Sequence, residues 1–234
     1  MLAFEIPAFP SVPVTGSDRR FPVGRIFCVG RNYEAHAREM GGDPTREAPF
    51  FFAKFPQSIV QSGATVPYPP VSTSYHHEAE LVIAIGQEGA ALDLDRAHAI
   101  VFGYAAGLDM TRRDLQNVAK EKGRPWDTAK NFAHSAPIGA IRPVAGNGHL
   151  AAGAISLTVD GAEKQTGDVA DMVWNPFEVL VHLSKIERLL PGDLVYTGTP
   201  AGVGPVQPGN VVKVTIAGLA PLEVTIGERE AAFR

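Results

Sequence analysis

The sequence predicts a mixed α+β fold that is rich in β-strands and carries a few short helices. Two observations favour this class. The chain has 24 glycines and 19 prolines in 234 residues, which is about 18% where roughly 12% is usual. Short apolar runs that end at these turn residues also outnumber the helical patterns by at least two to one.

The expected strands are apolar or alternating runs bounded by glycine, proline, asparagine or aspartate. In chain order they cover residues 25–30, 50–55, 78–86, 99–109, 155–159, 162–166, 193–197, 210–216 and 221–226. The dipeptide Asp160-Gly161 lies between two of these runs and is a strong signal for a β-hairpin.

Two short helices are expected in the first half of the chain. Asn32 can cap a helix that continues to Met40, where two glycines end it. Thr111 begins the next helix, with Asp114 three residues later in an arrangement like a capping box. That helix should end at Gly123.

A third helix is expected over residues 175–190, before a proline. Its start combines three signals, which are Asn175 as the cap, Pro176 in the first helical position and Glu178 in the third.

The domain organisation is expected to be simple. Residues 1–20 are proline-rich and should form an extended N-terminal arm, while residues 21–234 should form one domain. The only cysteine, Cys28, has no partner for an intrachain disulfide, which fits a reducing cytosol. The N-terminus has no basic region typical of a signal peptide. The longest uncharged apolar stretch, residues 99–108, is too short to span a bilayer.

A cytoplasmic protein without a membrane partner is therefore expected. The formal net charge of −4 argues against a nucleic-acid-binding protein, which usually carries a basic excess.

Two glutamates at the start of an apolar strand are the first candidate site residues. Glu78 and Glu80 lie two residues apart, so they point to the same strand face. Neighbouring carboxylates repel unless a cation lies between them, and hard divalent cations take such oxygen ligands. A solvent-facing polar edge is the alternative. His76 has the same parity and could add a ligand.

Asp109 stands where an apolar strand passes into a helix, a position where acids also serve as helix caps. Arg113 and Gln116 follow at steps of four and three, so an acid, a cation and an amide share one helix face. Such a face could clamp a carboxylate ligand that is bound to a metal.

Other candidates carry weaker signals. His36 and Glu39 share a helix face, where a carboxylate can make an imidazole a better base, although a solvated surface pair has the same spacing. Lys54 and Lys130 lie among apolar residues, where a lysine either extends to solvent or is functional. Thr199 belongs to a glycine-containing loop that could bind a carboxylate.

Read together, these segments resemble the fumarylacetoacetate hydrolase family. The matching pieces are CVGRNYEAHAREMG, PFFFAKF, YHHEAELVIAIG, YAAGLDMTRRDLQ, GRPWDTAKNF and GDLVYTGTPAGVGP, in the family's order over roughly residues 20–227. Each piece alone is a weak signal, but the joint pattern is highly specific. Within the family, the chain is most similar to fumarylpyruvate hydrolases and to the acylpyruvate hydrolase/oxaloacetate decarboxylase branch.

The resemblance implies a fold of the β-roll or distorted-barrel type, and a homodimer. It also implies a role for each candidate residue. Glu78, Glu80 and Asp109 would bind Mg²⁺ or Mn²⁺; His36 and Glu39 would form a lid dyad that activates water; Lys130 would stabilise an enolate or oxyanion; Arg113, Gln116, Thr199 and, less directly, Lys54 would bind the substrate.

The activity implied is hydrolysis of a carbon–carbon bond in a β-diketo acid, with 3-fumarylpyruvate giving fumarate and pyruvate in aromatic catabolism. Two alternatives stay open. One is a related enzyme that hydrolyses acylpyruvates, decarboxylates oxaloacetate or isomerises a keto acid. The other is a module that binds an oxo acid without turnover.

Overall fold

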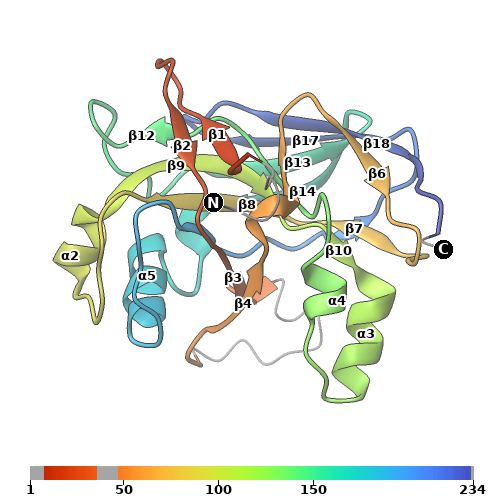
Figure 1. The fold of residues 1–234 in the computed structure, drawn as a ribbon, viewed down its shortest axis with the longest axis horizontal. Helices are drawn as coiled ribbons and strands as arrows, with labels where there is room; N and C mark the ends of the chain where they lie inside the picture. The colour runs from red at the N-terminus through yellow and green to blue at the C-terminus, as the bar shows by residue number, and fades with distance from the viewer. Residues whose placement is uncertain (1–7, 36–46, 233–234) are drawn as a thin grey trace, which may run out of the picture.

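An eight-stranded mixed sheet lies at the centre of the computed structural model, which describes residues 8–35 and 47–232. Its strands run in the order β4-β3-β15-β8-β9-β11-β5, and β12 pairs with β9 beside this path. They are β3 (Ile26–Gly30), β4 (Phe50–Lys54), β5 (Ile59–Gln61), β8 (Ala79–Ile85), β9 (Val101–Leu108), β11 (Ala136–Ile138), β12 (Arg142–Pro143) and β15 (Leu194–Tyr196). Figure 1 shows the long strands β8 and β9 curving across the middle of the molecule.

A second sheet has five strands in the order β14-β13-β17-β18-β6. These are β6 (Thr65–Tyr68), β13 (Ala154–Val159), β14 (Ala162–Asp168), β17 (Val211–Ile216) and β18 (Leu222–Arg229). Buried and exposed residues alternate along β17, so this sheet has one covered face and one open face.

Two small sheets complete the β-structure. One pairs β1 (Ser11–Pro13) with β2 (Arg20–Pro22), and the other joins β10 (Thr111–Arg112), β7 (Tyr75–His77) and β16 (Gly204–Pro205). Val12 and Val14 of the predicted N-terminal arm are buried beside the central sheet. This part of the arm therefore packs against the domain.

The strand β8 is buried on both faces, as its uninterrupted apolar sequence predicts. Leu81, Ile83 and Ile85 belong to the larger hydrophobic core, which also contains buried residues of the five-stranded sheet. Val82 and Ala84 belong to a smaller core with the β1–β2 hairpin. A polar side chain at the start of β8 is therefore carried into the interior.

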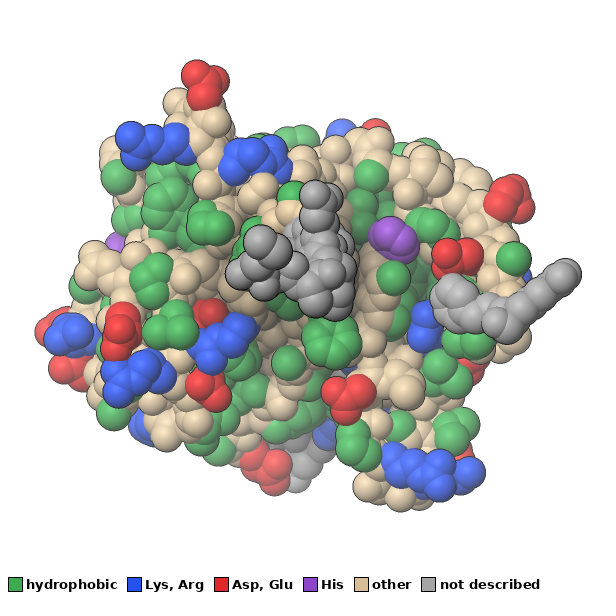
Figure 2. Space-filling view, in the orientation of Figure 1, with side chains coloured by type: hydrophobic (Ala, Val, Ile, Leu, Met, Phe, Trp, Pro, Cys, Tyr) green, Lys and Arg blue, Asp and Glu red, His purple; other side chains and the backbone are tan. Residues whose placement is uncertain are grey.

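The helices in the described residues are short: α2 (Leu94–Ala99), α3 (Arg113–Glu121), α4 (Asp127–Lys130) and α5 (Pro176–Ser184), with 3-10 turns η1 (Pro56–Ser58) and η2 (Val169–Asp171). Figure 1 shows α2 beside α5, and α3 beside α4. Among the described residues, no helix is long and apolar enough to cross a membrane. On the face drawn in Figure 2, basic and acidic side chains of the described residues are mixed rather than gathered in a basic stripe.

The hairpin predicted at Asp160-Gly161 and the start of the helix predicted over residues 175–190 are confirmed, but the end of that helix is not. Asp160 and Gly161 both have positive φ, at 51° and 79°, in the turn between β13 and β14. The capping box of Asn175 and Glu178 starts α5. The predicted end near residue 190 is wrong, because Leu189 instead pairs with Gly89 in an isolated bridge.

The helix predicted from Thr111 begins two residues later. Thr111 pairs with His76 between β10 and β7, and its hydroxyl donates to the carbonyl oxygen of Asp109 at 3.1 Å. Asp114 is not part of a capping box, because its carboxylate accepts hydrogen bonds from Ser72 Oγ and the Thr73 backbone. The sequence interpretation also missed α2, which precedes β9.

Candidate active site

Three buried carboxylates meet where β8 begins and β9 ends. Glu78 precedes β8, Glu80 lies within it, and Asp109 follows β9. The antiparallel pairing of β8 with β9 places Ala79 opposite Leu108, and Asp109 N–H donates to the Glu78 carbonyl at 2.9 Å. One oxygen from each carboxylate lies within 4.8 Å of the others. This cluster agrees with the set of metal ligands expected from the sequence.

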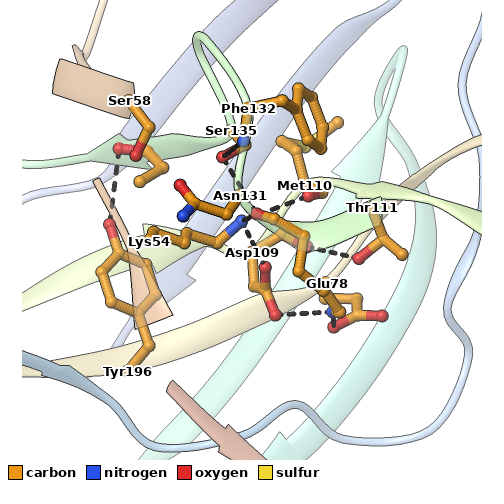
Figure 3. Close-up of polar contacts among 12 residues, drawn as sticks. Lys54, Ser58, Glu78, Asp109, Met110, Thr111, Asn131, Phe132, Ser135 and Tyr196 are labelled. Atoms are coloured by element: carbon orange, nitrogen blue, oxygen red, sulfur yellow. Dashed lines mark hydrogen bonds and ion pairs between the residues drawn. The ribbon is translucent and has the colours of Figure 1, made fainter. Parts of the chain in front are cut away.

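Buried cations neutralise two of these acids. The Lys130 ammonium lies 2.6 Å from Oε2 of Glu78 and 2.6 Å from Oδ2 of Asp109. The Lys54 ammonium lies 2.8 Å from Oδ1 of Asp109, and Arg113 forms an ion pair with Glu78. Figure 3 shows the side chains of Lys54 and Asp109 pointing toward one another. Burial alone lowers the pKa of Lys130, but the charges of Asp109 and Glu78 outweigh burial and raise it. The two carboxylates therefore favour the protonated form of Lys130.

Glu80 is in a different environment. Its Oε2 accepts a hydrogen bond of 2.8 Å from the backbone N–H of Gly198, and no cationic side chain of the described residues forms an ion pair with it. Burial, followed by the charges of Asp109 and Glu78, raises the pKa of Glu80 well above its ordinary value. An added cation would relieve this repulsion, and the all-oxygen ligand set suits Mg²⁺ or Mn²⁺.

Arg113 and Gln116 share the buried side of α3, as their spacing predicts. Nη1 of Arg113 donates to Oε1 of Gln116 at 2.5 Å, whereas its buried Nε has no hydrogen-bond partner among the residues that the structure describes. The Gln116 amide nitrogen remains as a donor, because Arg113 occupies the oxygen. The two side chains therefore offer N–H groups for an anion.

Thr199 lies in the loop after β15 and is held by a residue that the sequence analysis missed. Nε2 of Gln165 donates to Thr199 Oγ1 at 2.8 Å and to the Pro200 carbonyl at 2.8 Å. Oε1 of Gln165 accepts from the Ala79 backbone N–H at 3.0 Å. Gln165 thus ties this loop to the start of β8.

One cavity brings most of the candidate residues together. It is lined by Glu78, Glu80, Asp109, Arg113, Gln116, Lys130 and Thr199, together with Val29, Gly30, Arg31, Phe52, Lys120 and Trp126, which the sequence analysis did not select. Lys54 is not among the lining residues. Its ammonium instead contacts Asp109 and the carbonyl oxygens of Met110 and Lys130. His36 and Glu39 lie outside the described residues.

The start of the predicted lid is anchored by Asn32. Its amide group donates to the carbonyls of Trp174 and Thr197, each at 2.8 Å, and accepts from the Trp174 N–H at 2.8 Å. The expectation that Asn32 caps the helix is therefore wrong, because its side chain binds distant backbone groups and the helix begins at Glu34. These bonds connect the segment before His36 to the loop that carries Thr199. The predicted course of this helix from His36 to Met40 lies outside the described residues.

Comparisons with known proteins agree with this geometry. Residues 25–227 match the family model described as fumarylacetoacetate (FAA) hydrolase C-terminal. The chain is 48% identical over 188 residues to fumarylpyruvate hydrolase from a Ralstonia species, covering 80% of this chain and 97% of that protein. It is 41% identical over 196 residues to the mitochondrial oxaloacetate decarboxylase of Dictyostelium discoideum, covering 83% and 89%.

A solved structure is also similar along the whole chain. It is the crystal structure of fumarylpyruvate hydrolase from Pseudomonas aeruginosa in complex with Mn²⁺ and pyruvate, at a TM-score of 0.95 and 47% identity, covering 98% of this chain and all (100%) of that one. With its fold, its carboxylate cluster and these similarities, the chain belongs to the fumarylacetoacetate hydrolase family.

Proposed function

We propose that the protein is a metal-dependent hydrolase that converts 3-fumarylpyruvate and water into fumarate and pyruvate. The observation that carries this proposal is the convergence of three buried carboxylates with Lys130 and Arg113 at one cavity. The similar Ralstonia and Pseudomonas proteins, both named fumarylpyruvate hydrolases, support the choice of substrate.

Glu78, Glu80 and Asp109 are the residues that would hold the cation. A divalent cation bound there would supply Lewis-acid stabilisation to the pyruvate enolate that leaves. The Mn²⁺ complex of the Pseudomonas relative supports Mn²⁺ or Mg²⁺ as the ion.

The oxo-acid end of the substrate would be bound by Arg113, Gln116 and Thr199. Arg113 Nε and the Gln116 amide nitrogen are available donors, as described above. The Thr199 oxygen already accepts from Gln165, so its hydroxyl hydrogen is free to donate. These groups complement the carboxylate and 2-oxo oxygens common to the candidate substrates.

Lys130 is the proposed oxyanion donor. Two of its three N–H bonds point to Glu78 and Asp109, which leaves the third for the oxygen of the attacked carbonyl. Water adds to carbon 4, the bond between carbons 3 and 4 breaks, and its electron pair passes to the pyruvate enolate, which is then protonated. By the family resemblance, His36 takes the proton from water and Glu39 orients His36.

An ultraviolet assay with fumarylpyruvate, acetylpyruvate and oxaloacetate side by side tests this proposal. We expect the highest kcat/KM for fumarylpyruvate. A clear preference for oxaloacetate would favour the second candidate activity, which the identity to the Dictyostelium decarboxylase supports. Binding of oxo acids without turnover of any of them would favour a binding module.

A homodimer is part of the same proposal. It is supported by two large apolar side chains, Phe9 and Phe55, which are 69% and 63% exposed in the single chain. Light scattering during size-exclusion chromatography should give about twice the chain mass of 24.9 kDa. A mass of one chain would contradict this part.

A further inference from the structure

Two cations at the cavity take no part in the carboxylate network. Lys120 lies in the last turn of α3, four residues after Gln116 and seven after Arg113. These spacings place all three side chains on one helix face, with Lys120 about 10 Å beyond Arg113 along the axis. Arg31, directly after β3, lines the same cavity.

Within residues 8–35 and 47–232, neither Lys120 nor Arg31 forms an ion pair with an acidic side chain. Burial, and then repulsion by Arg113 and Arg31, lowers the pKa of Lys120 to about 8. The charge of Glu78 opposes this shift, but Lys120 and Arg31 form no direct ion pair of their own in the described residues, so both remain available at the cavity wall to bind an anion.

The backbone of Arg31 adds to this picture. Its φ is 61°, in the left-handed region that a residue with a Cβ seldom adopts. Such conformations persist where the surroundings fix them, and they are concentrated at ligand sites. A glycine at position 31 would adopt this φ without strain, but the chain has an arginine there, and its side chain lines the cavity.

The cavity also has aromatic walls. Phe52 and Trp126 both line it, with ring centroids 6.1 Å apart. The Lys120 ammonium lies 5.4 Å from the centre of the Trp126 ring, a cation–π contact that holds the lysine at this wall. Flat apolar walls suit a planar, conjugated carbon chain.

We propose that Lys120, assisted by Arg31, binds the carboxylate at the far end of the substrate from the oxo-acid group. This inference rests on the proposed function, in which Arg113 and Gln116 hold the oxo-acid end. A seven-carbon dianion such as fumarylpyruvate can reach both ends of the cationic helix face. Acetylpyruvate ends in a methyl group, and oxaloacetate is three carbons shorter, so neither makes the same contact. Lys120 is thus a specificity-determining residue.

The test compares Lys120→Met, Lys120→Arg and the control Lys122→Met, whose lysine is exposed just after α3 and does not line the cavity. In Lys120→Met we expect kcat/KM for fumarylpyruvate to fall about 10- to 150-fold, as loss of one charged hydrogen bond predicts. The kcat/KM for acetylpyruvate and inhibition by oxalate, which have no far carboxylate, should stay nearly unchanged. Lys120→Arg should recover most of the loss, and Lys122→Met should behave as the wild type.

The outcomes separate the two proposals. If the wild type hydrolyses fumarylpyruvate and Lys120→Met does so equally well, the far-end site is wrong while the proposed function stands. Equal losses for fumarylpyruvate, acetylpyruvate and oxalate would also overturn it, because they indicate damage to the whole cavity. If the wild type hydrolyses no fumarylpyruvate at all, the proposed function itself fails.

Discussion

The ammonium of Lys54 lies 2.8 Å from Oδ1 of Asp109, and both side chains are almost completely buried. Lys54 also donates to the carbonyl oxygens of Lys130 and Met110. It therefore joins β4 to the end of β9 and to α4, and we propose that it positions Asp109 instead of binding substrate.

Lys54→Met should lower the free energy of unfolding by about 3–5 kcal/mol, because it leaves a buried carboxylate with one partner fewer. Urea denaturation measures this change. Lys213→Met is the matched control, since its contact with Glu223 at 3.9 Å is half exposed; it should cost about 0–1 kcal/mol. Equal stability of the wild type and Lys54→Met would contradict the structural role.

Metal removal gives a second prediction. A chelator should abolish turnover, and Mn²⁺ or Mg²⁺ should restore it. Mn²⁺ should also raise the unfolding temperature, because it binds the folded cluster of acids. Glu80→Gln should weaken this thermal shift, whereas Glu223→Gln, on the exposed side of β18, should leave it unchanged. Full activity in a protein shown to be free of metal would end this interpretation.

Arg113 should bind the end that all candidate substrates share. Arg113→Ala should therefore weaken fumarylpyruvate, acetylpyruvate and oxalate alike, each by about 10- to 150-fold, as expected for a charged hydrogen bond. Kinetics and oxalate titration measure the effect. A loss confined to fumarylpyruvate would show that Arg113 binds the far carboxylate and that the proposed orientation is reversed.

His36 and Glu39 are predicted to act as one unit. His36→Ala and Glu39→Ala should each lower kcat by about 10²–10⁴-fold, which is the usual contribution of a general base. The double variant should be little worse than the poorer single variant. Oxalate affinity is the internal control and should change far less. Near-normal turnover in His36→Ala would remove the pair from the mechanism.

Asp114 predicts a dependence of stability on pH. Burial alone would raise its pKa, but hydrogen bonds from Thr73, Ser72 and Leu115 outweigh burial and hold the pKa below its ordinary value of 3.8. The folded state therefore gains stability from this carboxylate above pH 3.8, and loses it as the pH falls through the lowered pKa.

Asp114→Asn should accordingly lower the free energy of unfolding by about 1 kcal/mol at pH 7, the usual value of such bonds. The difference from the wild type should persist to about pH 4 and shrink at more acidic pH. Urea denaturation at a series of pH values tests this. A difference that grows with acidity would have the wrong sign.

The carboxylate cluster could be predicted because its geometry is local. Glu78 and Glu80 lie two residues apart at the start of β8, so an extended backbone directs both side chains to the same side, and the apolar run after them indicates burial on both sides. Arg113 and Gln116 share one side of α3, as their spacing predicts, whereas the expectation that Asp109 lies on the same helix face is wrong, because α3 begins only at Arg113. In these cases the spacing of two or three neighbouring residues is enough to predict which side chains lie together.

Other features depend on contacts between distant parts of the chain. Gln165 stands between exposed residues of a hairpin strand, and only its bonds to Ala79 and Thr199 reveal its role. The side chain of Asn32 would suit a helix cap equally well, but it instead forms hydrogen bonds with the backbone of Trp174 and Thr197, which lie 142 and 165 residues later in the chain. Lys120 is one of several lysines near the end of α3, and the cavity alone distinguishes it.

The position of β15 has a consequence for how the protein is made. This strand lies between β3 and β8, and its residue Leu194 pairs with Ile26, 168 residues earlier. Until residues 194–196 have left the ribosome, β3 and β8 each present an open, apolar edge, which is prone to associate with other chains. The loop that follows β15 supplies Gly198 N–H to Glu80, so this bond of the carboxylate cluster forms only after the insertion. Recovery of activity during refolding should therefore follow the slow closure of the central sheet and not the early formation of hairpins.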